Sequence, residues 1–140
     1  MAKTLIATQT ASSSSSLSFT SGIDSTYDVY EFHFTNMHPA TNNVNLCFQV
    51  NASDDTGGDF DTSLIASGAF RAYLKEDGSG GTLAYDTGSD NARTTGFQRI
   101  LSTGTGNDAD QSVSGVLTIY APSSTTYVKN FVAVGNGADH

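Results

Sequence analysis

The stretch that decides the fold is residues 112–134, which read S-V-S-G-V-L-T-I-Y-A-P-S-S-T-T-Y-V-K-N-F-V-A-V. Two runs rich in β-branched and aromatic residues, which favour strands, flank the short connection A-P-S-S-T at residues 121–125. Pro122 has no backbone N–H to donate to a sheet, so it belongs in the turn. We therefore predict a β-hairpin, which offers no reaction centre.

Alternation of apolar and polar residues extends the strand prediction outward from this hairpin. Residues 44–50 carry the strictest alternation in the chain, and residues 27–35 form the longest early strand candidate. Shorter strand candidates are residues 4–8, 17–20, 69–75, 82–85 and 97–101.

Polar segments rich in Gly, Ser and Asp separate these strands, and no segment has the 3.6-residue period of a helix. We therefore predict an all-β fold, a single antiparallel β-sandwich of jelly-roll type with Gly/Ser/Asp-rich loops. Residues 1–140 form one domain in this prediction, and residues 1–16 are a candidate extended N-terminal arm. The loop candidates are residues 11–16, 54–61, 76–81, 88–96 and 104–111.

The composition argues against nucleic acid and membranes as partners. Six Lys and Arg face fourteen Asp and Glu, giving a net charge of −8, and contacts to nucleic-acid phosphates need a basic patch instead. No stretch approaches the length of a membrane span, and residues 5–7 are too short for the apolar part of a signal peptide. We predict no nucleic-acid or membrane partner, and synthesis in a cytosol.

Cys47 is the single cysteine, so no intrachain disulfide forms. Its apolar neighbours Leu46 and Phe48 favour a small buried hydrophobe over a reactive thiol.

Calcium is the one cofactor that the sequence raises, because acidic side chains cluster in two loops. The loops lack the EF-hand and nonapeptide spacings, so solvated turn aspartates are the preferred interpretation and we predict no cofactor. The acidic residues are Asp54, Asp55, Asp59 and Asp61 in the first loop, and Asp108 and Asp110 in the second.

Signals for metal or acid–base chemistry at histidine are also weak. His33 and His38 lack the spacing of same-face strand ligands or of a helical metal motif, and His140 is terminal. The chain has no Gly-x-Ser-x-Gly nucleophile motif and no phosphate-binding loop. Of the acidic residues, only Glu31 lies inside a strong strand, so a glycosidase pair is not indicated. We predict a protein without catalytic residues.

Aromatic side chains provide the best case for ligand binding. Sugar-binding sandwiches expose aromatic platforms, although Tyr at strand positions more often packs in a core or an interface. The candidate platform residues are Tyr27, Tyr73, Tyr85, Tyr120 and Tyr127.

Three blocks, residues 12–41, 70–97 and 106–131, carry a family resemblance. The most specific phrases are F-T-S-G-I-D-S-T-Y at residues 19–27 and P-S-S-T-T-Y-V-K at residues 122–129. With them the chain resembles a family of small virion structural proteins of tailed phages, especially marine ones such as cyanophages. The resemblance implies a location in the virion, after assembly in the host cytoplasm, more than it implies a mechanism.

Similar sequences continue with further strands beyond the segment V-K-x-F, whereas this sequence ends soon after Val134. An unpaired strand edge there invites pairing with another chain. We therefore expect a homo-oligomer whose sheet is completed against a neighbouring subunit. The interface residues predicted on this basis are Tyr127, Val128, Phe131, Val132 and Val134.

The resulting expectation is a non-enzymatic capsid decoration or cement protein that contacts other virion proteins, above all the major capsid protein. The alternative is a tail-fibre or appendage module that binds host surface carbohydrate through exposed Tyr and Asp.

Overall fold

A computed structural model describes residues 2–52, 60, 63–75, 77–101 and 103–138 of the chain. All the regular structure in these residues is β-strand, every strand pair is antiparallel, and no helix occurs in them. The prediction of an all-β fold is therefore confirmed.

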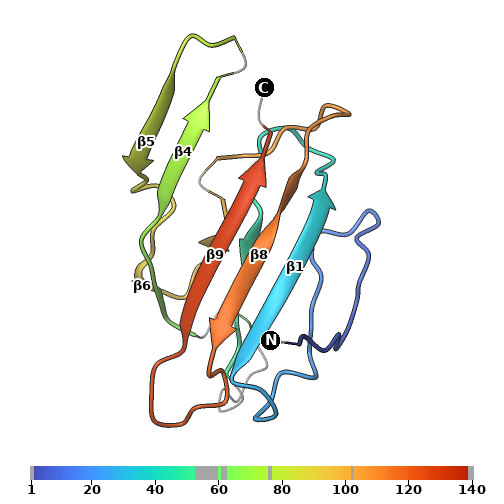
Figure 1. Cartoon of the computed structure of the whole chain (residues 1–140), viewed down its shortest axis with the longest axis vertical. Coiled ribbons are helices and arrows are strands. Elements are labelled where there is room, and N and C mark those ends of the chain that lie inside the picture. The colour runs from blue at the N-terminus through green and yellow to red at the C-terminus, as the bar shows by residue number, and fades with distance from the viewer. Residues whose placement is uncertain (1, 53–59, 61–62, 76, 102, 139–140) are drawn as a thin grey trace.

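The strands form one three-stranded sheet, in the order β1-β8-β9, and three two-stranded sheets, β2-β7, β3-β6 and β4-β5 (Figure 1). The finer prediction of a single jelly-roll sandwich is not confirmed, because these sheets are small and separate. The strand bounds are β1 Val29–Met37, β2 Cys47–Phe48, β3 Ile65–Ala66, β4 Phe70–Leu74, β5 Gly81–Tyr85, β6 Ala92–Thr94, β7 Gln98–Arg99, β8 Val113–Tyr120 and β9 Asn130–Gly137.

The hairpin predicted from residues 112–134 is the centre of the largest sheet. Strand β8 pairs with β9 along its whole length and with β1 on its other edge, so that Leu117 lies opposite both Ala133 and Phe32. Pro122 lies in the turn, as predicted. The turn is longer than expected, because β9 begins only at Asn130.

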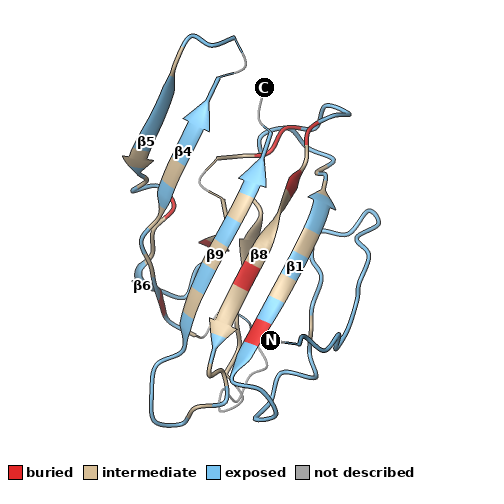
Figure 2. Cartoon of the chain, viewed as in Figure 1, coloured by how far each residue is buried: buried red, intermediate tan, exposed pale blue. Residues whose placement is uncertain are grey.

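The core lies on one face of this sheet. Tyr30, Val113 and Leu117 are buried on that face, since residues opposite one another in antiparallel strands share a face (Figure 2). Phe48 of β2 packs edge-on against Phe131 of β9, with 5.1 Å between the ring centroids. The short strand pair β2-β7 thus covers the inner face at β9.

Two strand predictions were wrong for the same physical reason. Residues 4–8 and 17–20 have strand-like sequences, but neither segment is a strand in the structure. A strand requires a neighbouring chain segment to share its hydrogen bonds, and these residues find none within the described chain.

Two further predictions were only partly right. Residues 44–50 form just the two-residue strand β2 and an isolated bridge between Val44 and Thr105, because their partner β7 is equally short. Residues 88–96, expected as a loop, contain the short strand β6. The loop at residues 54–61, with Asp54, Asp55, Asp59 and Asp61, lies outside the described residues, apart from Phe60.

The chain covers little of its own apolar surface. A compact 14.6-kDa monomer exposes about 6,900 Å² by the usual size scaling. This chain exposes 9897 Å², and the buried hydrophobic residues in the described part are only Tyr30, Ile65, Val113 and Leu117. Many large apolar side chains of the described residues therefore face solvent, among them Phe70, Leu74 and Leu83.

Substituting Leu117→Ala should destabilise the fold strongly, because it removes a side chain that is 5% exposed at the centre of the largest sheet. We expect a loss of about 2–5 kcal/mol in the free energy of unfolding, measured by urea denaturation. Val134→Ala, on the outer face of the neighbouring strand, serves as the control and should cost less than about 1 kcal/mol. Equal losses for the two variants would contradict this location of the core.

Candidate functional site

The buried polar cluster around Gln98 supports the structure and has no free reactive group. Gln98 accepts a hydrogen bond from Ser67 Oγ at 2.5 Å and donates to the backbone oxygens of Ser89 and Arg99. Ser89 in turn donates to Asp86 Oδ2 at 2.7 Å. This hydrogen bond is the main cause that lowers the pKa of Asp86. The cluster ties β7 to the loop before β6, which is a structural role.

The described histidines make local contacts only. His38 Nδ1 lies 2.6 Å from the backbone oxygen of Gln111, which holds together two loops, and His33 Nε2 lies 2.7 Å from Glu31 Oε2. His140 falls outside the described residues. Asp108 takes part in a turn in which the Gln111 backbone N–H donates to its backbone oxygen at 2.9 Å.

No group of three His, Cys, Asp or Glu side chains that could hold a metal ion occurs in the part of the chain that the structure describes. The first acidic loop, which raised the calcium question, lies largely outside that part.

Cys47 is a half-buried free thiol on β2. Burial raises the pKa of this thiol, which keeps it protonated and poorly nucleophilic. Cys47 is thus only half-buried, less than the buried position predicted from its neighbours, and its raised pKa fits a thiol of low reactivity.

The most unusual surface of the molecule is one face of the β4-β5 hairpin. The register places Phe70 opposite Tyr85 and Ala72 opposite Leu83, so apolar side chains gather on a single face. Phe70, Leu74 and Leu83 are 77–80% exposed. A two-stranded hairpin is marginally stable by itself in water, so an apolar face left open on one is a candidate docking surface.

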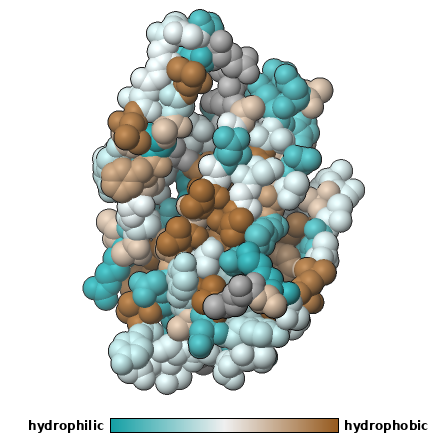
Figure 3. Space-filling model, viewed as in Figure 1, coloured by the Kyte–Doolittle hydropathy of each residue, from teal (hydrophilic) through white to brown (hydrophobic). Residues whose placement is uncertain are grey.

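A second apolar surface lies on the outer face of the three-stranded sheet. Val134 lies opposite Val116 in the register of β8 and β9, and Val132 is the next residue of β9 on the same face. Val132 and Val134 are both exposed. Figure 3 shows hydrophobic side chains gathered near the middle of this view, beside hydrophilic ones.

A groove of about 230 Å³ separates the two apolar surfaces. Strand β4 contributes Phe70 and Tyr73 to its lining, β9 contributes Val134, and Ile100 and Leu101 lie between the strands in sequence and line it as well. The groove therefore lies between two strands, each of which is paired on one side only.

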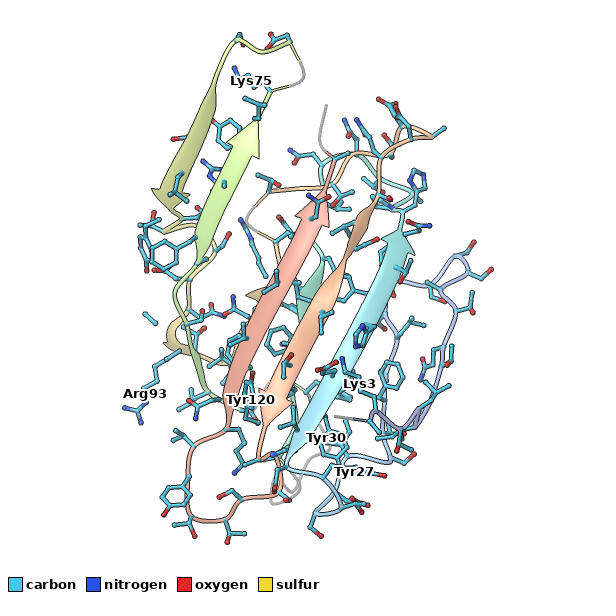
Figure 4. The ribbon with its side chains drawn as sticks, viewed as in Figure 1. Lys3, Tyr27, Tyr30, Lys75, Arg93 and Tyr120 are labelled. Atoms are coloured by element: carbon cyan, nitrogen blue, oxygen red, sulfur yellow. The ribbon has the colours of Figure 1, made fainter. Side chains whose placement is uncertain are left out.

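The N-terminal arm, residues 2–28, lies on the far side of the sheet, next to β1 (Figure 1). Lys3 forms an ion pair with Glu31 of β1, and Figure 4 shows Lys3 over that strand. Gln9 donates to the backbone oxygen of Ser18 at 2.7 Å, and the ring of Phe19 meets that of Phe32 edge-on at 5.6 Å. Side-chain contacts with β1 therefore attach the first part of the arm, whereas at its end the Asp28 backbone oxygen accepts a hydrogen bond from the Ala121 N–H at 2.6 Å.

The residues predicted for an interface fall into three places. Tyr127 and Val128 lie in the loop before β9 and are strongly exposed, while Val132 and Val134 lie on the outer face. Phe131 lies on the inner face, half-buried against Phe48. The structure thus brings Val132 and Val134 together, and their role in an interface stays a prediction.

The five tyrosines proposed as a platform are all exposed, but they do not form one surface. Tyr73 and Tyr85 lie on opposite faces of the β4-β5 hairpin, because Tyr85 shares a face with Phe70. Tyr85 donates a hydrogen bond to Asp90 at 2.5 Å, which raises the pKa of the phenol. Figure 4 places Tyr27 and Tyr120 toward one end of the large sheet, far from the hairpin.

Sequence reasoning missed the apolar face of the hairpin. The signal was present, since apolar residues alternate at positions 70, 72 and 74 and again at 83 and 85. Alternation alone places residues on a face, but it does not reveal whether another layer covers that face.

These exposed apolar surfaces suit the burial of apolar area against another polypeptide. The described residues include no helix of the length and apolarity that crossing a membrane takes. Comparison with protein-family models, curated proteins and solved structures finds no match for this chain.

Acidification should detach residues 3–9 of the arm from Glu31 on β1. The hydrogen bond from Lys3, and next that from His33, hold the pKa of Glu31 below the ordinary value of 4.5. The attachment is therefore complete above pH 4.5 and is lost as the pH falls through the lowered pKa of Glu31. NMR relaxation of the residue 3–9 amides should report greater mobility at about pH 3 than at about pH 6.

The matched control for this acid release is Lys3→Met, in which the mobility of the arm should be high at both pH values. An arm whose relaxation is unchanged between the two pH values in the unmodified chain would contradict the role of Glu31.

Proposed function

We propose that this chain is a non-enzymatic structural subunit of a bacteriophage virion, and that it decorates or cements the capsid surface. The observation that carries the proposal is the apolar surface that its own chain leaves uncovered on the β4-β5 hairpin and on β9. The resemblance of residues 12–41, 70–97 and 106–131 to phage virion proteins supplies the biological setting.

Exposed strand edges and apolar faces are hazards for a free monomer, because they template pairing with other chains. They suit a subunit that repeats on a symmetric shell, where neighbouring copies cover them. In this proposal the partners are the major capsid protein, other virion proteins and further copies of this chain. Such an assembled subunit completes a jelly-roll-type sandwich, for which the contact of Phe48 with Phe131 supplies the beginning of a second layer.

The surface charge fits such an exterior role. A net charge of −8 keeps the outward surface soluble and disfavours contact with the packaged nucleic acid. The proposal requires no cofactor and no catalytic residue, and it places the protein in the virion after assembly in the host cytoplasm.

Quantitative mass spectrometry of purified virions tests this proposal. A decoration or cement protein should be present at a copy number comparable with that of the major shell protein. A copy number of only a few per particle, or absence from the virion, would overturn it.

A pair of variants locates the contact surface. Leu74→Gln with Leu83→Gln should lower occupancy on the capsid, because both residues lie on the exposed apolar face of the hairpin. Thr82→Gln, on the other face of the same hairpin, is the matched control and should bind normally. Equal occupancy for both variants would remove the hairpin face from the interface.

The second candidate is a tail-fibre or appendage module that binds host surface carbohydrate. The observation in its favour is the exposure of Tyr27, Tyr73, Tyr85, Tyr120 and Tyr127. Aromatic faces stack on the apolar faces of sugar rings, and Tyr127 is the most exposed of the five.

Glycan-array binding tests this alternative. If Tyr127 stacks on a sugar, Tyr127→Ala should abolish binding, whereas Tyr127→Phe should retain most of it because the ring remains. A wild-type chain that binds no glycan would eliminate the fibre-module alternative and leave the capsid proposal untouched.

A further inference from the structure

The groove between β4 and β9 has the form of a sheet that lacks one strand. Each of these strands pairs on one side only, β4 with β5 and β9 with β8, and their other edges face the groove. Figure 1 shows β4 and β9 pointing in the same direction, with β5 and β8 pointing in the opposite one. One strand running against both would create a six-stranded antiparallel sheet in the order β1-β8-β9-added-β4-β5.

The lining of the groove suits a strand with apolar side chains. Phe70, Leu101 and Val134 offer apolar contacts, while the edges of β4 and β9 offer backbone N–H and C=O groups. Arg71 of the same wall holds its guanidinium 5.5 Å from the ring of Tyr73, and its Nε is buried without a hydrogen-bond partner. An unsatisfied buried donor is costly, and it marks this wall as incomplete.

The N-terminal segment, residues 3–10, has a strand-like sequence but no strand partner within the described chain. Its sequence K-T-L-I-A-T-Q-T alternates in the manner of a strand, yet no backbone–backbone hydrogen bond joins it to the rest of the described chain. Leu5 is 82% exposed. Ile6 is nearly half exposed and rests on Gly22, where an added Cβ would lie 2.6 Å from Ile6 Cγ2.

Net charge favours the approach of this segment to a second copy, while the one charged residue among the described residues that line the groove is Arg71. Residues 1–23 contain Lys3 and no Asp or Glu, whereas the whole chain carries −8, so the remaining residues carry −9. A segment of net positive charge approaches such an acidic body favourably.

We propose that residues 3–10 of a second copy enter the groove as a strand antiparallel to both β9 and β4. The segment has eight residues, which equals the length of β9, so one edge can be paired from end to end. This inference deepens the proposed subunit role by naming the self-contact through which copies join, and it rests on that role only for its biological purpose.

Moving the arm into the groove of a second copy breaks few contacts and buries apolar side chains. The arm gives up the exposed Lys3–Glu31 ion pair, and solvent-exposed pairs of this kind contribute little to stability. The added strand covers apolar groove residues that now face solvent, since Phe70 is 77% and Val134 is 68% exposed. Two copies that exchange arms reciprocally close a dimer, and one-way exchange builds a chain.

Mixed disulfide trapping tests the exchange between copies. In a Cys47→Ser background, one preparation carries Ile6→Cys and a differently tagged one carries Val134→Cys, because end-to-end antiparallel pairing of residues 3–10 with β9 places Ile6 opposite Val134. After mixing and mild oxidation, non-reducing gels should show the hetero-crosslinked species in strong yield, because Ile6 and Val134 meet only in the groove. Val128→Cys, which is similarly exposed but lies outside the groove, replaces Val134→Cys as the control and should give several-fold less.

Equal yields with Val134→Cys and Val128→Cys would overturn the proposal. Sedimentation of the unmodified chain gives a second readout, in which oligomers should be present and should disappear when residues 2–10 are deleted. An unmodified chain that sediments as a monomer, or oligomers that survive the deletion, would overturn the exchange. A high virion copy number found together with such a result would leave the structural-subunit role standing, so the two failures are distinguishable.

Discussion

The pairing of β8 with strands on both of its edges is the interaction on which the rest of the described structure depends. It is the only strand with two partners in that part of the chain, and it carries the two buried residues Val113 and Leu117. Each of the other three sheets in the described residues has only two strands, and an isolated two-stranded sheet is only marginally stable in water. Phe48 and the segment around Leu101 therefore pack against the inner face of the central sheet.

A core this small determines how the chain must obtain the rest of its stability. Hydrophobic residues make up 37% of the sequence, yet the large ones of the β4-β5 hairpin and of the outer face of β9 lie open to solvent. Burial of such side chains stabilises a protein by about 1.5–3 kcal/mol each, and in the proposed assembly contacts with other chains would bury them. Small-molecule sites are concave, mostly apolar pockets with a few convergent polar groups, whereas these surfaces are sheet faces and strand edges, which suit pairing with another strand.

The parts of the fold that the sequence predicted are those whose partners are close in sequence or strongly patterned. Residues 112–134 and 69–75 each precede or contain a turn that brings their partner alongside, and residues 27–35 carry a clear alternation. Residues 44–50 have the best pattern of all but form only β2, because pairing is limited by the two residues of β7. For the candidate site, the sequence indicated an open edge at the last strand candidate, and Val132 and Val134 of β9 are exposed. The open face of the hairpin required the register of Phe70 with Tyr85, which composition does not encode.

Residues 4–8 have a strand-like sequence but form no strand, and this difference is itself informative. Natural sequences are locally consistent with the structure they adopt, so a segment with strand chemistry and no strand partner points to a partner beyond its own chain. The groove between β4 and β9 is the complementary case, since it offers two strand edges of suitable direction with no strand between them. In the proposed exchange, residues 3–10 of one copy fill the strand position between β4 and β9 of another copy. Both halves of this contact are present in the one sequence. The hydrogen bonds that β8 provides at the centre of the sheet would then be continued outward by a second copy at its edge.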